Sequence, residues 1–142
     1  MANGEGDGEA FKQQSMEELR YIQQVYQNQY AMINNSINMV LRELQELNSA
    51  QKTLENIGLV KGKDTLTGIG GDFYLVGKVE DQSKVLVGIG EGYVIEKDTD
   101  SAKTHAAELI KKRTEDLNRL TKNKKEVESA LLEVSYRIEN SR

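Results

Sequence analysis

The residue types that carry most enzyme and metal chemistry are scarce in this sequence. His105 is the only histidine, and cysteine is absent. A transition-metal site therefore lacks ligands, and disulfides and thiol nucleophiles are excluded. No set of acid, base and nucleophile converges on a plausible pocket, so we expect no catalytic residue and no enzyme activity. His105 is expected to lie on the surface, in the first turn of a helix.

Two glycine-containing segments match nucleotide-binding motifs only in part. Gly62–Thr65 reads like the end of a phosphate-binding loop, but no upstream glycine stands at the required spacing. Gly68–Gly71 opens a strand, whereas a dinucleotide fingerprint opens a helix. Neither segment predicts a nucleotide site, so no cofactor and no metal are expected.

Charge and hydropathy exclude two further classes of partner. The formal net charge is −4 and no basic face is clustered, so we expect no nucleic acid. No apolar run approaches the ~20 residues that span a bilayer, and the N-terminus has no signal-peptide core. The sequence therefore predicts a soluble, cytoplasmic protein that does not enter a membrane.

Apolar residues recur at spacings of three and four on both sides of the chain's centre, which predicts two helices of a coiled coil. The first stripe comprises Leu19, Ile22, Tyr26, Tyr30, Ile33, Ile37, Val40, Leu44, Leu47, Ala50, Leu54 and Ile57. The second comprises Ala102, Ala106, Leu109, Arg113, Leu117, Leu120, Lys124, Val127, Leu131, Val134 and Ile138. The stems of the two cationic members can cover the seam while their charged groups reach water.

The two stripes have similar lengths, so they can pair antiparallel, with facing residues whose numbers sum to about 159. Gly58 is expected to end the first helix as a left-handed C′ residue. The segment Asp98–Ser101 offers N-cap candidates for the second helix, where acidic side chains also suit the helix dipole.

The centre of the chain contains a repeat at an offset of twenty residues, in which Leu66–Gly70 is answered by Leu86–Gly90. Each half is an apolar run, a glycine-rich turn and a second apolar run, which predicts two successive β-hairpins. Their turns are placed at Gly70–Asp72 and Gly90–Gly92, where glycine can adopt a positive φ. On one face of the second strand we place Phe73, Leu75 and Val79.

Four short strands expose unpaired edges, and an isolated pair of hairpins is at best marginally stable, so this region is expected to oligomerise. The predicted oligomerisation residues are Leu66, Ile69, Phe73, Leu75, Val85, Val87, Ile89, Tyr93 and Ile95.

The expected fold is mostly α with a small β part: a long antiparallel coiled-coil hairpin with two β-hairpins at its closed end. Residues 1–8 are Gly- and acid-rich and predict a disordered tail. Residues 9–57 form the first helix, 58–98 the double hairpin and 99–142 the second helix, as one structural domain.

From about Met16 to Arg142 the sequence resembles the alpha subunits of prefoldin, especially the archaeal form. The most specific part is the centre, where DTLTGIGGDFYLVGKV and KVLVGIGEGYVIEK look like that subunit's two linker hairpins. Gly68 departs from the family, whose members often carry proline there. The resemblance implies a heterohexamer of two alpha and four beta subunits, with a β-barrel platform built by the hairpins. It also implies an ATP-independent chaperone that holds unfolded proteins between coil tips and delivers them to a group II chaperonin.

Apolar side chains at the open end of the coiled coil are the candidates for client binding, because a holdase needs adaptable contacts with no fixed partner. They are Phe11, Met16, Leu19, Tyr21, Ile22, Val134, Tyr136 and Ile138. Four of them also fit as ordinary seam residues: Leu19, Ile22, Val134 and Ile138. The other four lie off the stripe.

Two alternatives remain open from the sequence. The charge-free segment Tyr21–Leu41 either contacts a client along the coil wall or is a solvated polar helix. The whole protein is either a chaperone subunit or a structural coiled-coil adaptor that uses its hairpins only to oligomerise. An adaptor should end in a charged, sealed coil, and the apolar tip favours the chaperone.

Overall fold

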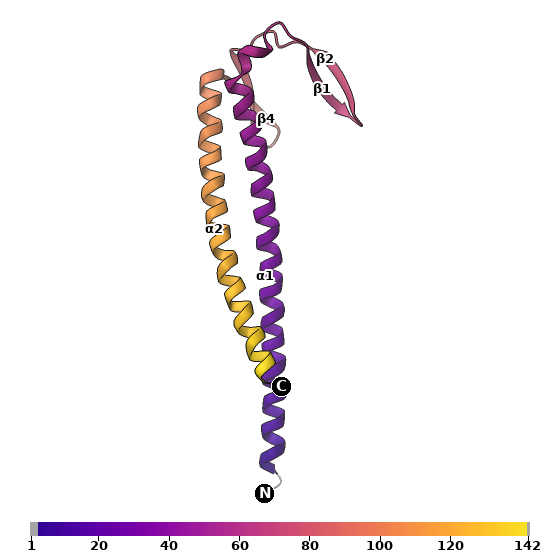
Figure 1. The fold of residues 1–142 in the computed structure, drawn as a ribbon, viewed down its shortest axis with the longest axis vertical. Coiled ribbons are helices and arrows are strands. Elements are labelled where there is room, and N and C mark those ends of the chain that lie inside the picture. The colour runs from indigo at the N-terminus through magenta and orange to yellow at the C-terminus, as the bar shows by residue number, and fades with distance from the viewer. Residues whose placement is uncertain (1–2, 142) are drawn as a thin grey trace. The chain divides into compact units, whose positions relative to one another are not determined.

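The computed structural model describes the backbone of residues 3–141 and the side chains of residues 15–141. In chain order the elements are helix α1 (Asn3–Glu55), a 3₁₀ turn (Ile57–Val60), strands β1 (Thr65–Gly70), β2 (Phe73–Gly77), β3 (Lys84–Gly90) and β4 (Tyr93–Asp98), and helix α2 (Thr99–Asn140) (Figure 1). The expected class, mostly α with two β-hairpins, is confirmed. No helix among the described residues is long and apolar enough to cross a membrane.

Helix α1 begins and ends at other residues than the sequence suggested. It starts at Asn3, inside the segment for which the composition predicted a disordered tail. Once a helix is nucleated, adding a residue fixes only one more pair of dihedrals, so glycines near its end are tolerated. At the other end α1 stops at Glu55, where the Asn56 side chain donates to the Lys52 carbonyl at 2.9 Å. Gly58 lies in the 3₁₀ turn without a positive φ, so its assignment as a C′ residue was wrong.

Helix α2 begins directly after β4, with Asp98 as the residue that joins them. One Asp98 carboxylate oxygen accepts a hydrogen bond from the Ser101 backbone N–H at 2.8 Å, and the other accepts one from the Ser101 hydroxyl at 2.9 Å. This is the N-cap that the sequence predicted. The hydrogen bonds to Ser101, backbone first and then side chain, hold the pKa of Asp98 below its ordinary value of 3.8.

The cap gives a prediction about pH. A carboxyl whose folded pKa is depressed stabilises the folded state above the unfolded pKa, and this contribution disappears as the pH falls through the lower folded value. Asp98→Asn keeps a capping oxygen and removes the charge. Its melting temperature should therefore be lower than that of the wild type at pH 7, and the two melting temperatures should converge as the pH falls below 3.8 through the lowered pKa of Asp98. Thermal melts followed by circular dichroism at both pH values measure this. A difference between the two proteins that did not depend on pH would contradict it.

The chain divides into two units, of which the first combines Met1–Leu41 with Glu115–Arg142. In this unit α1 and α2 bury Val40, Val134 and Ile138. Two polar pairs also join the helices. The Gln23 amide donates to the Ser135 hydroxyl at 3.1 Å, and the Lys124 ammonium lies 5.5 Å from the centre of the Tyr30 ring. The residue numbers of these pairs sum to 158 and 154, close to the predicted antiparallel register.

The second unit comprises Arg42–Thr114 and contains the hairpins. The Nε atom of Arg113 on α2 lies 3.2 Å from Oε2 of Glu43 on α1. This cationic residue of the stripe therefore pairs with an acid, whereas Lys124, the other cationic residue, lies over an aromatic ring. The buried cluster of this unit joins Leu54 of α1 to Ala102 and Ala106 of α2.

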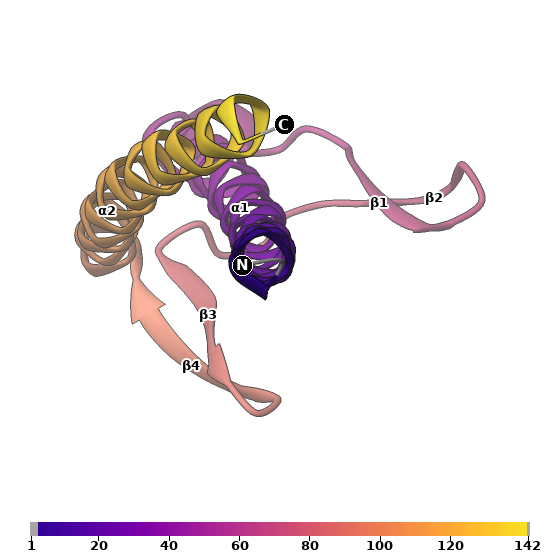
Figure 2. The same cartoon turned by 90° about the horizontal axis from the view of Figure 1, so that it is seen from below.

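The four strands form two separate two-stranded antiparallel sheets, β1–β2 and β3–β4 (Figure 2). Both hairpins have the same register: Gly70 pairs with Phe73 and Gly90 with Tyr93, with an irregularity just before each. The residues inside both turns have positive φ, 54° and 62° at Gly71 and Asp72. The turns and the repeat are therefore confirmed, whereas Val79 lies beyond the end of β2 and does not belong to its face.

Candidate functional site

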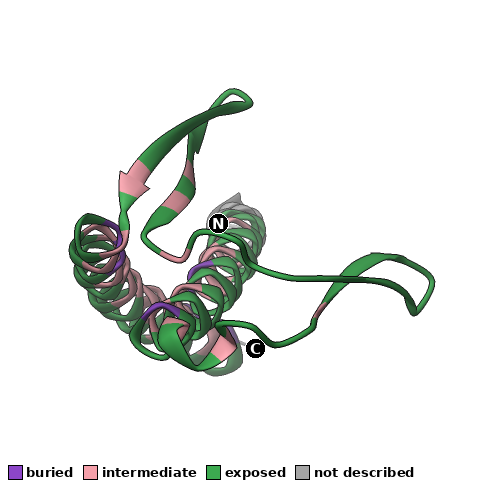
Figure 3. Cartoon of the chain, turned by 90° about the horizontal axis from the view of Figure 1, so that it is seen from above, coloured by how far each residue is buried: buried purple, intermediate pink, exposed green. Residues whose placement is uncertain are grey.

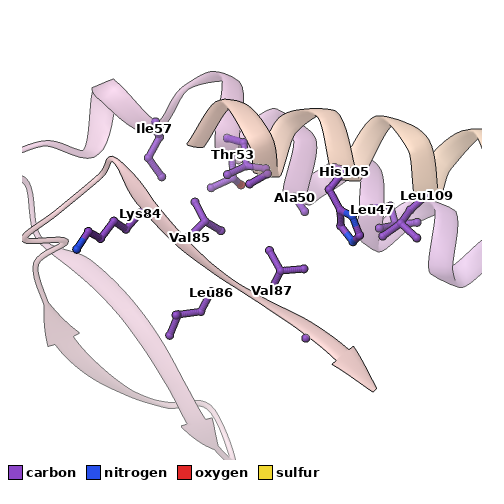
Figure 4. A pocket seen from close by; sticks show the side chains of 14 residues that line it. Leu47, Ala50, Thr53, Ile57, Lys84, Val85, Leu86, Val87, His105 and Leu109 are labelled. Carbon is purple, nitrogen blue, oxygen red and sulfur yellow. The ribbon is translucent and has the colours of Figure 1, made fainter. Parts of the chain in front are cut away.

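The β3–β4 hairpin uses one face to dock on its own helices. Val85 and Val87 are half-buried and pack against the cluster of Leu54, Ala102 and Ala106. In Figure 4 both valines lie on the side of β3 that faces the helices, and Leu86 points the other way. Val85 and Val87 therefore make an intrachain contact. This contact was not expected, because the sequence pattern predicted both valines to be oligomerisation residues.

A groove of about 500 Å³ remains between β3 and the two helices. Its wall is mostly apolar, with Leu47 from α1, Ile57 from the 3₁₀ turn and Leu109 from α2 among its lining residues (Figure 4). His105 also lines it and is half-buried in the second turn of α2, so its expected place on the surface of the first turn was wrong. The reason is the helical spacing: His105 lies three residues after Ala102 and next to Ala106, so it flanks the buried side of α2.

The connection from β2 to β3 is fixed to the start of α2. The Thr99 hydroxyl donates to the Gln82 carbonyl at 2.5 Å, and the Thr99 N–H donates to the Ser83 carbonyl at 3.0 Å. Asp81 accepts hydrogen bonds from the Ser83 side chain and backbone, and these bonds lower the Asp81 pKa. The base of β3 is thus held in place before any other chain is involved.

The β1–β2 hairpin, by contrast, is exposed along nearly its whole length (Figure 3). Apolar side chains lie on both of its faces. Leu66 and Val76 are cross-strand partners on one face, with exposed fractions of 68% and 67%. Phe73 and Leu75 lie on the other, with exposed fractions of 70% and 59%. A two-stranded sheet with this much uncovered apolar surface is not stable alone in water, so both faces need a covering layer.

The repeat is therefore not symmetric in its chemistry. Leu66 faces Val76, whereas Leu86, twenty residues on, faces Glu96. Glu96 also lies 3.6 Å from Lys84, so the outward face of β3–β4 carries an ion pair between exposed side chains. One hairpin is apolar on both faces. The other has one face on its own helices and one face on which Leu86 and Val94 are exposed beside the Lys84–Glu96 ion pair.

The remaining predicted oligomerisation residues are also accessible. Ile69 and Ile89 sit at the irregularities and are more than half exposed, as is Tyr93, while Ile95 is 38% exposed. These side chains are available to another chain.

The predicted client-binding residues separate into two groups. Val134 and Ile138 are buried between α1 and α2, which agrees with their interpretation as seam residues and leaves them inaccessible to a client. Leu19 is half-buried. Ile22 was also expected in the seam, but it is exposed.

The candidates off the stripe are mostly accessible. Tyr21 of α1 is 71% exposed and Tyr136 of α2 is 66% exposed. Met16 is half-buried. Phe11 lies outside the residues whose side chains are described.

Leu132 was missed by the sequence analysis and is the most exposed large apolar side chain of α2, at 73%. The doublet Leu131–Leu132 could have revealed it, because neighbouring residues in a helix point about 100° apart and only one can enter a narrow seam. The structure places Leu131 half-buried and Leu132 in the open.

Comparisons with known proteins agree with the fold. The family described as prefoldin subunit matches residues 26–140. The chain is 29% identical to the prefoldin subunit alpha of Thermofilum pendens over 118 residues, which cover 72% of this chain and 92% of that one. It is 26% identical to the prefoldin subunit alpha of Pyrococcus horikoshii over 125 residues, which cover 87% and 80%.

A solved structure shares the same architecture. The cryo-EM structure of filamentous PFD from Methanocaldococcus jannaschii has a TM-score of 0.53 and 21% sequence identity, and the match covers 82% of this chain and 92% of that one. Since the family match spans most of the sequence and the two helices with their paired hairpins have the corresponding fold, this chain belongs to the prefoldin subunit family, whose members are chaperone subunits that form oligomeric complexes and work with chaperonins.

Proposed function

We propose that this chain is the alpha-type subunit of a cytoplasmic heterohexamer of two alpha-type and four beta-type prefoldin subunits. In this complex it holds unfolded proteins without ATP and passes them to a group II chaperonin. The relatives named above are alpha subunits. This chain also has the two β-hairpins that an alpha-type subunit needs for assembly.

The observation that carries the proposal is the β1–β2 hairpin, which is apolar on both faces and uncovered by its own chain. Its apolar side chains are each 59% exposed or more: Leu66, Val76, Phe73 and Leu75. Contiguous exposed apolar side chains mark sites of interaction with another protein. In the hexamer, strands of neighbouring subunits would extend each hairpin at its free edges and cover its faces, as closure into a barrel does for any sheet.

Client capture is assigned to the first of the two units. Tyr21, Tyr136 and Leu132 are each about two-thirds or more exposed, and all lie in the unit of Met1–Leu41 and Glu115–Arg142. Large side chains without a fixed partner suit the transient binding of unfolded segments, because the contact depends on area and not on a specific shape. A coiled coil that served only as a structural adaptor would present charged groups at these positions.

Aggregation assays test the proposal directly. The complex of this chain with a beta-type subunit should suppress light scattering by a chemically denatured client when it is diluted into buffer without nucleotide. Adding ATP should leave the protection unchanged, since the binding contacts involve no nucleotide. The matched control is this chain alone, whose hairpins lack partners. Protection that required ATP, or its absence in the assembled complex, would contradict the proposal.

A further inference from the structure

Four side chains form a continuous line along the exposed surface of α1 in the unit of Met1–Leu41 and Glu115–Arg142. They alternate amide and thioether groups, at spacings of four, three and four residues, so they share one helix face. We call them the methionine stripe: Asn28, Met32, Asn35 and Met39. All four are exposed, Met32 at 69% and Met39 at 60%.

The surroundings of the methionine stripe are unusual in charge. No charged residue occurs between Tyr21 and Leu41, although charged residues make up 30% of the chain. The facing part of α2 in the same unit, residues 115–128, is the opposite: it includes an exposed Arg119 paired with Asp116 at 3.3 Å, and the lysines of residues 122–125. The two helices therefore present different surfaces. The surface of α1 is uncharged and repels no partner electrostatically, whereas the surface of α2 is charged and strongly hydrated.

The composition of the stripe argues against a folded helix as its occupant. A coiled-coil partner needs an unbroken apolar repeat, with flanking charges that fix its register and identity. Here every second position is an amide and the flanking charges are missing. Nothing on this surface would select one partner helix or one register.

An extended chain fits the stripe better. Met32 and Met39 lie about 10 Å apart along the helix axis, which matches about three residues of an extended polypeptide. Methionine adapts to side chains of different shape, while the amides of Asn28 and Asn35 can donate to and accept from a client's unpaired backbone groups. The absence of charge means that clients of either net charge can approach equally.

We propose that the methionine stripe is a second client-binding surface, which takes extended apolar segments of unfolded polypeptides irrespective of their net charge. This inference rests on the proposed function and adds the wall of the coiled coil to the tip. It assigns the charge-free segment of α1 a role that a merely solvated helix would not have.

The test uses the full hexamer and two permanently unfolded probes, reduced and carbamidomethylated α-lactalbumin, which is acidic, and lysozyme, which is basic. The Met32→Gln/Met39→Gln double variant removes the apolar groups without adding charge, and Met and Gln have similar helix propensities. We expect both probes to bind about tenfold more weakly by fluorescence anisotropy. The matched control is Gln27→Ser/Asn38→Ser on other faces of the same helix, where both side chains are exposed and binding should be unchanged.

A photoreactive amino acid at position 32 should crosslink to both probes, and one at position 27 should not. Equal affinity of the Met→Gln variant and the wild type, or crosslinks from position 32 to another subunit instead of the probes, would overturn the stripe as a client site. If the wild-type hexamer bound neither probe, the proposed function itself would fail. The wild-type measurement therefore separates the two failures.

Discussion

Leu66→Lys is expected to abolish assembly of the proposed hexamer, whereas Leu86→Lys is expected to leave it intact. The two leucines are equivalent in the repeat and are similarly exposed in the isolated chain, at 68% and 72%. They differ in their cross-strand partners, because Leu66 faces Val76 and Leu86 faces Glu96. The new lysine would therefore be an unpaired charge on an apolar face in one hairpin and would join an acid in the other.

The expected size of the effect follows from the environment that the assembly would create. An unpaired charge buried in an interface costs about 3–5 kcal/mol, which corresponds to a hundredfold or greater loss in affinity. Sedimentation velocity of the chain co-expressed with a beta-type subunit should show hexamers for the wild type and for Leu86→Lys, and smaller species for Leu66→Lys. Circular dichroism should show full helix content in all three, because neither leucine is among the residues packed against the buried cluster of Leu54, Ala102 and Ala106.

Ile89→Asp provides a second variant on the other hairpin. Ile89 is 56% exposed and sits at the irregularity of β3, so an aspartate there should also prevent assembly. Val87→Asp is less selective, since Val87 packs against the chain's own helices and the change would detach β3 from them. Intact hexamers for both Leu66→Lys and Ile89→Asp would refute the assignment of the hairpins as the assembly surface.

The double variant Tyr21→Ser/Tyr136→Ser should assemble normally and hold clients poorly. Both rings are about two-thirds exposed or more, so little packing is lost, and Ser and Tyr have similar helix propensities. The melting temperature should hardly change, since substitutions at exposed positions usually alter the free energy of unfolding by no more than about 0.5 kcal/mol. Each large apolar side chain contributes about 1.5–3 kcal/mol when a client covers it fully, and less for partial cover. Affinity for a denatured client should therefore fall at least about tenfold.

Aggregation suppression and client affinity of the assembled hexamer measure this effect. The control is Gln27→Ser/Glu139→Ser, which makes the same replacement at exposed polar positions of the same two helices and should retain full protection. Undiminished protection by the tyrosine variant would exclude these two rings as the gripping surface. It would shift client binding to the methionine stripe or to the beta-type subunits.

The features of this protein that depend on local spacing could be predicted from the sequence. Apolar residues at spacings of three and four residues determine which face of each helix enters the seam. Facing pairs such as Gln23 with Ser135 lie close to the predicted register. The turns at Gly71–Asp72 and Glu91–Gly92 follow from the need for positive φ at both central residues, which glycine meets most easily. The Asp98 cap is equally local, because its partner is three residues away.

Which apolar residues are covered, and by which other residues, depends on the fold and could not be predicted. Val85 and Val87 look like exposed hairpin residues in the sequence, yet they pack on Leu54, Ala102 and Ala106, which are far away along the chain. The two hairpins have nearly the same pattern, but one is docked on its own helices and the other is bare on both faces. Burial depends on the surface that arrives from elsewhere in the fold, and a repeat of twenty residues contains no information about that surface.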